Sequence, residues 1–98
     1  MIIHQARNGD TLTLAPEGRL DTVSSPELDA LLDHVDPSVS GLVLDLEKTE
    51  YISSAGIRVV LRAHQKMEER NGLVIRNANS VVMDIFGLTG LTDLLCFE

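Results

Sequence analysis

The sequence has no tryptophan, and aromatic residues make up only 3% of its 98 residues. Proteins that bind single-stranded nucleic acids stack bases on aromatic side chains, so this scarcity argues against that class. Basic residues are also few: eight Lys and Arg stand against fifteen Asp and Glu, for a net charge of −7. Such a surface repels the phosphates of nucleic acids and of anionic membranes. The expected partners are therefore proteins or small molecules.

Cysteine and long apolar runs are also scarce. Cys96 is the single cysteine, so no internal disulfide can form, which is typical of a reducing compartment. The residues from Met1 to His4 lack the basic segment and long apolar run of a signal peptide. No stretch approaches the roughly 20 apolar residues that cross a bilayer. We expect a cytoplasmic protein without direct membrane insertion, and we expect Cys96 to be a small core residue.

The sequence also lacks the motifs of common enzymes. Its histidines His4, His34 and His64 lie far apart and match no metal-ligand spacing. There is no CxxC pair, no GxSxG elbow and no glycine-rich phosphate loop, because the segment 87–90 is too short and has no lysine. We therefore predict no catalytic activity, no metal and no cofactor.

The residues that are present predict one α/β domain over residues 1–98. A tight turn is expected at residues 8–10, where Asn-Gly favours a hairpin. The nearly continuous apolar run 42–46 is typical of a strand covered on both faces. Further strands are expected at 11–16, 73–75 and 94–97.

Three segments have the start signals or the apolar spacing of helices. Ser24-Ser25-Pro26 predicts a helix start with a hydroxyl cap, followed by apolar residues through Val35. A second helix is expected from residues 53–56 to the Asn71-Gly72 pair, and a short third one over 80–86. The predicted order is β-β-α-β-α-β-α-β. Because strands that alternate with helices need crossover connections, the sheet is expected to be mixed and parallel in part.

The segment Ser53-Ser54-Ala55-Gly56 is the main candidate for a functional site. A serine at a helix start can cap exposed backbone N–H groups, and the same groups and the helix dipole favour a phosphate there. Phosphorylation would add between about one and a half and two negative charges while leaving the helix intact. From the residues alone, a structural cap and a modification site both remain open.

The segment 42–46 followed by 51–57 resembles the signature of the STAS family, which includes bacterial anti-sigma factor antagonists of the sporulation and general-stress type. Further matching segments occur in the family's order at 18–21, 73–75 and 85–91. The resemblance spans nearly the whole chain. It implies a STAS-like sheet with helices packed mainly on one side.

The resemblance also implies a phosphorylatable residue at Ser54. Sporulation-type members often carry Asp immediately before this residue, whereas this chain has a second serine, Ser53, which is therefore the alternative site. Asp21 matches the family's acidic residue near that site. Family members bind an anti-sigma factor, often itself a serine kinase, whose phosphorylation of the antagonist breaks the complex; a phosphatase restores it. The principal alternative is a constitutive STAS interaction subunit of an ABC lipid-transport or scaffold complex, without phosphoregulation. A third is an enzyme or ligand sensor with a shallow pocket near Asp21 and Ser54.

A basic stripe runs along the expected second helix at i, i+4 spacing, formed by Arg58, Arg62, Lys66 and Arg70. It is either a solvated face or a surface for an acidic patch on a partner. Arg58 could reach back one turn to a phosphate on Ser54. The oligomeric state stays open. The predicted partner-binding residues are Asp21, Ser53, Ser54, Gly56, Arg58 and Arg62.

Overall fold

The chain begins with the expected hairpin. In the computed structural model, which describes residues 1–98, strand β1 (Ile3–Asn8) pairs antiparallel with β2 (Thr11–Pro16). Gly9 has a φ of +63° at the turn, a conformation that glycine adopts without a steric penalty. The pair Asn8 and Thr11 closes the turn, so Gly9 rather than Asn8 supplies the positive φ that was expected here.

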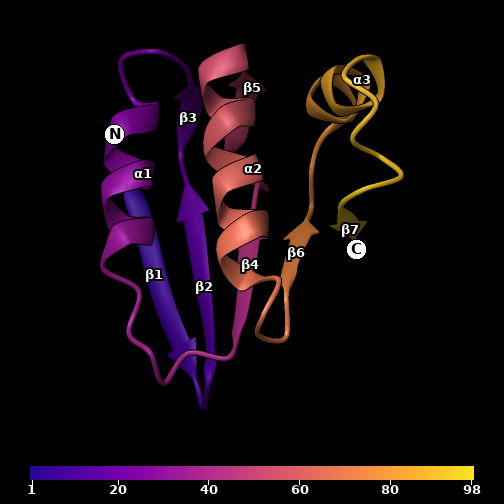
Figure 1. Ribbon diagram of the computed structural model, residues 1–98. Helices are drawn as coiled ribbons and strands as arrows, with labels where there is room; N and C mark the ends of the chain where they lie inside the picture. The colour runs from indigo at the N-terminus through magenta and orange to yellow at the C-terminus, as the bar shows by residue number, and fades with distance from the viewer.

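The remaining strands of the main sheet run parallel to β2. They are β4 (Gly41–Asp45), β6 (Leu73–Arg76) and β7 (Cys96–Phe97), and the spatial order is β1-β2-β4-β6-β7. Helices α1 (Ser25–Asp33) and α2 (Ser54–Met67) form crossover connections and lie on the same face of the sheet (Figure 1). Helix α3 (Ser80–Leu88) lies beyond the β6 side of the sheet. The predicted mixed sheet with helices mainly on one side is confirmed.

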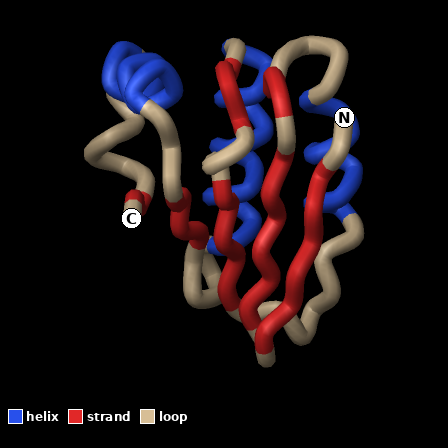
Figure 2. Tube along the Cα trace, turned by 180° about the vertical axis from the view of Figure 1, so that it is seen from behind, coloured by secondary structure: helices blue, strands red, loops and turns tan.

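The face of the sheet turned away from α1 and α2 carries no helix (Figure 2). Val43 points to this face in register with Thr13 of β2 and Val74 of β6, yet it is buried. Its burial comes from the strands on both sides rather than from a second layer of helices. The apolar run 42–46 had predicted a strand covered on both faces, and this part of the prediction is wrong.

Two short strands were missing from the predicted order. Strand β3 (Gly18–Leu20) and strand β5 (Thr49–Ile52) form a separate parallel pair next to the main sheet. At the other end of the chain, β7 covers only two of the four residues expected in the last strand, and Cys96 is exposed. Cys96 shares the register of Val74 and so faces the helix-free side, which is why it is not the core residue expected.

The core lies between the sheet and the two crossover helices. Leu14, Leu44 and Ile75 contribute from the strands, while Leu28 and Val60 contribute from α1 and α2. Phe86 anchors α3 to the same core and meets Phe97 edge-on, with ring centroids 5.3 Å apart. No helix of the chain is long and apolar enough to span a bilayer.

Candidate functional site

The small β3–β5 pair brings two predicted site segments together. Because the strands are parallel, their carboxyl ends lie at the same edge, with Leu20 in register with Ile52. The Ser53 N–H donates to the Leu20 carbonyl at 2.9 Å, which continues the pairing past the strand ends. Asp21 and Ser53, the next residues of the two strands, therefore lie side by side.

The buried Thr49 fixes this pair to the rest of the molecule. Its hydroxyl donates to the Pro16 carbonyl at 2.8 Å, and its own carbonyl accepts from the Asn79 side chain at 3.1 Å. Asn79 also caps α3, since its side-chain oxygen accepts from the Val82 N–H at 2.8 Å. The hairpin, the β3–β5 pair and α3 are thus joined through one buried residue.

Asp21 organises the start of α1. Its Oδ1 accepts hydrogen bonds from the N–H groups of Val23 and Ser24, at 3.0 and 3.1 Å. The Ser24 hydroxyl donates to the Arg19 carbonyl at 2.6 Å and makes no capping bond to the helix. The predicted helix start is confirmed, but the expected hydroxyl cap is wrong, because Pro26 has no N–H group and the Glu27 N–H donates to the Ser24 carbonyl rather than to its hydroxyl. The Ser24 N–H, above all, lowers the pKa of the Asp21 carboxyl below its ordinary value.

The start of α2 separates the two candidate serines. Ser53 is the N-cap residue, but its side chain makes no capping bond, and its buried Oγ has no hydrogen-bond partner. Ser54 is the first helical residue and is exposed. The N–H groups of Ser54, Ala55 and Gly56 find no acceptor within the chain. Ser54 is therefore not the structural cap considered in the sequence analysis.

Gly56 is buried rather than exposed to a partner. A Cβ at this position would lie 2.6 Å from Ile52 Cγ1 and 2.7 Å from the Leu20 carbonyl oxygen. Only glycine lets the first turn of α2 approach β3 and β5 this closely. Gly56 was predicted as a partner contact; the structure corrects this to a positioning role, because the residue offers no surface.

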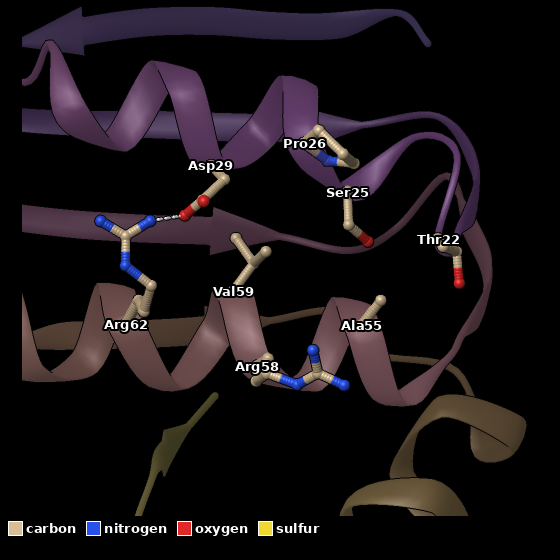
Figure 3. Close-up of a pocket in the computed structure, with 8 residues that line it drawn as sticks. All are labelled: Thr22, Ser25, Pro26, Asp29, Ala55, Arg58, Val59 and Arg62. Carbon is tan, nitrogen blue, oxygen red and sulfur yellow. Dashed lines mark hydrogen bonds and ion pairs between the residues drawn. The ribbon is translucent and has the colours of Figure 1, made fainter.

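Some cations of the basic stripe make contacts within the protein, and others do not. Arg62 pairs with Asp29 and with Asp33, the latter at 2.9 Å, and so links α2 to α1. Arg70 donates to the Val39 carbonyl at 2.8 Å. Arg58 is exposed and makes no ion pair. Its guanidinium lies along α2 on the side of Ala55, towards the start of the helix (Figure 3).

A cavity of about 310 Å³ lies between the N-terminal halves of α1 and α2. Figure 3 shows its lining residues, with Ser25 and Asp29 on α1 and Arg58 and Arg62 on α2. The sequence analysis missed Ser25 and Asp29 as members of this region. The i, i+4 spacing of Asp29 and Asp33 could have indicated an acidic face towards the basic stripe, whereas nothing in the sequence placed Ser25 against α2.

Comparison with known proteins agrees with this architecture. The family model described as "Mlab, STAS domain" matches residues 3–96. BtrV of Bordetella bronchiseptica, provisionally named an anti-sigma factor antagonist, is 32% identical over 80 residues, which cover 80% of this chain and 69% of BtrV.

Three solved structures share the fold at low sequence identity. An anti-sigma factor antagonist from Mycobacterium paratuberculosis is 19% identical, with a TM-score of 0.89 over 99% of this chain and 84% of that one. SpoIIAA in its unphosphorylated form is 18% identical, with a TM-score of 0.83 over 99% and 88%. A structure of Bacillus SpoIIAA in its phosphorylated form also matches, with a TM-score of 0.77 over 99% of this chain and 91% of that one at 17% identity. From the family match and the BtrV identity together, the chain belongs to the STAS domain family.

Proposed function

We propose that this protein is an anti-sigma factor antagonist whose binding to the anti-sigma factor is controlled by phosphorylation of Ser54. The observation that carries the proposal is the chemistry around this hydroxyl. It is exposed on the first turn of α2, next to three backbone N–H groups without acceptors and one turn before the unpaired Arg58. A phosphate there gains hydrogen bonds and a counter-charge without disturbing the core.

The names of the relatives support the same function. BtrV and the two antagonists of solved structure are named for it, and SpoIIAA is described in both phosphorylation states. In our proposal the partner is itself a serine kinase that transfers the γ-phosphate of ATP to Ser54, and a phosphatase removes it. The chain supplies the substrate hydroxyl and a docking surface around Asp21, Arg58 and the start of α2. Phosphate on Ser54 then adds charge at the centre of that surface and weakens the complex.

The proposal is tested with the serine-kinase anti-sigma factors of the source organism, purified and mixed with this protein and labelled ATP. We expect label on the wild type and on Ser53→Ala, but none on Ser54→Ala. Ser80→Ala is the matched control, because Ser80 is also an exposed serine at the first position of a helix. Label on Ser80 or Ser53 in place of Ser54 would contradict the assignment of the site.

Binding is measured in the same system without ATP. Ser54→Asp is expected to weaken binding to the anti-sigma factor at least tenfold, whereas Ser80→Asp leaves it unchanged. If no such kinase binds and both variants join the same transporter or scaffold complex as the wild type, the constitutive-subunit alternative replaces the antagonist.

A further inference from the structure

The cavity between α1 and α2 has two kinds of wall. Pro26, Ala55 and Val59 give it an apolar lining, while Ser25 and Arg58 bring polar groups to it (Figure 3). Its volume of about 310 Å³ is at the lower end of the range of small-molecule sites. The cavity therefore has room for a ligand of a few heavy atoms with one polar end.

Ser25 carries a hydroxyl that no group of the protein satisfies. The residue is only 2% exposed, and its Oγ has no hydrogen-bond partner. A buried hydroxyl without a partner has lost its hydrogen bonds to water with nothing in return, so such groups are rare in folded proteins. Figure 3 shows the hydroxyl pointing from α1 towards α2, into the space that the lining residues enclose. The hydroxyl therefore provides one unused hydrogen-bond donor on the cavity side of α1.

The charges around the cavity select an anion. Two arginines, Arg58 and Arg62, and one carboxylate, Asp29, line the cavity. Arg62 is paired with Asp29 and with Asp33 outside the lining, whereas Arg58 has no acidic partner. The start of α2 adds the positive end of the helix dipole, with N–H groups that lack acceptors. The lining residues therefore carry one net positive charge, even though the whole chain carries −7.

We propose that this cavity binds a small organic carboxylate. Its carboxylate pairs with Arg58 and accepts a hydrogen bond from the Ser25 hydroxyl, and its short aliphatic body lies against Ala55 and Val59. The apolar lining favours such a ligand over an inorganic oxyanion, which gains nothing from apolar contacts. The proposal does not depend on the antagonist function, since it concerns the unmodified protein alone.

The test is a titration of the ¹⁵N-labelled protein with butyrate, followed by amide chemical shifts. We expect saturable shifts confined to the amides that surround the cavity on α1 and α2. Arg58→Gln is expected to weaken binding about tenfold and Ser25→Ala severalfold, because a charge-assisted pair is stronger than one neutral hydrogen bond. Lys66→Gln is the matched control, since Lys66 is an exposed cation on α2 that does not line the cavity, and it should leave the affinity unchanged.

Three further ligands separate the parts of the proposal. Butanol has the aliphatic body without the charge, butylammonium has the opposite charge, and inorganic phosphate has the charge without the body. Each is expected to bind at least tenfold more weakly than butyrate. The proposal would be overturned if butanol or phosphate bound as tightly as butyrate. It would also be overturned if the shifts caused by butyrate did not saturate, or if Arg58→Gln left the affinity for butyrate unchanged. Ser25→Ala removes no hydrogen bond of the fold, so this variant is expected to stay folded. A well-dispersed amide spectrum checks this before its affinity is compared with that of the wild type.

Discussion

Two consecutive serines at the start of α2 have different surroundings. Ser53 has an extended backbone, with φ −93° and ψ 178°, and its Oγ is buried without a partner. Ser54, one residue later, has helical backbone and is exposed. A kinase must bring the phosphate of ATP into contact with the hydroxyl oxygen, so accessibility favours Ser54. The difference arises from where the helix begins, which sequence patterns locate only to within a few residues.

Arg58 offers a test at the residue scale. Helical side chains lean towards the N-terminus, so this guanidinium is placed to pair with a phosphate on Ser54. We predict that Arg58→Ala lowers the melting temperature of the phosphorylated protein by a few degrees more than that of the unmodified protein, since an exposed pair contributes about 1 kcal/mol or less. Lys66→Ala should shift both forms equally. Equal shifts of both forms in Arg58→Ala would contradict the pairing.

The carboxyl of Asp21 predicts a pH dependence. Hydrogen bonds from the backbone N–H groups of Ser24 and Val23 lower its pKa in the folded protein below the ordinary value of an aspartate side chain. The fold therefore favours the ionised form. The stabilisation is fully present at pH values above the ordinary pKa of an unfolded aspartate and is lost as the pH falls through the lowered pKa of the folded state.

Urea unfolding at a series of pH values, with Asp21→Asn beside the wild type, measures this contribution. The wild type is expected to have the higher free energy of unfolding at neutral pH, and the difference should shrink on acidification. Asp36, whose pKa is lowered by hydrogen bonds from Ser38, titrates in both proteins and cancels in the comparison. A difference that stays constant through the acid range would rule out the assignment to Asp21.

At the scale of elements, the β3–β5 pair is the part of the fold that determines the site. The sequence predicted the two crossover helices and the main strands, because their apolar residues recur over enough positions to show a period. Strands β3 and β5 have only three and four residues, too few to show an alternation. Their pairing depends on distant contacts such as the hydrogen bond from Thr49 to Pro16, which no local pattern reveals. The family resemblance nevertheless located the residues that follow both strands.

Glycine substitutions test how closely α2 packs on this pair. Gly56→Ala is expected to destabilise the protein by roughly 1–3 kcal/mol, because its Cβ would overlap Ile52 and the Leu20 carbonyl. Gly87→Ala is the matched control, since Gly87 also lies in a helix but has open space where its Cβ would be. It should stabilise the protein by about 0.5–1 kcal/mol through helix propensity alone. Chemical denaturation measures the free energy of unfolding of both variants. If Gly56→Ala left this free energy unchanged, the close approach of α2 to β3 and β5 would be refuted.

At the scale of the whole molecule, α3 and the last strand depend on one aromatic contact. Phe86 is fully buried and packs edge-on against Phe97, while Val82 is the other buried residue of α3. Phe86→Ala is expected to cost roughly 3–5 kcal/mol, a large part of the stability of a domain of this size. Leu88→Ala on the same helix removes an exposed side chain and should change the stability by less than about 0.5 kcal/mol. If urea unfolding gives Phe86→Ala a cost below about 1 kcal/mol, α3 does not unfold together with the sheet.

The two outer strands of the main sheet also affect how copies of the chain meet. Strand β1 leaves one long side unpaired, but every residue from His4 to Asn8 is exposed, and Arg7 among them carries a charge. On the opposite side β7 offers only two residues. Charged and very short outer strands are poor templates for adding a further strand, which is how many sheet proteins avoid joining into fibrils. The protein can therefore stay dispersed at high concentration without a cover over either border of its sheet.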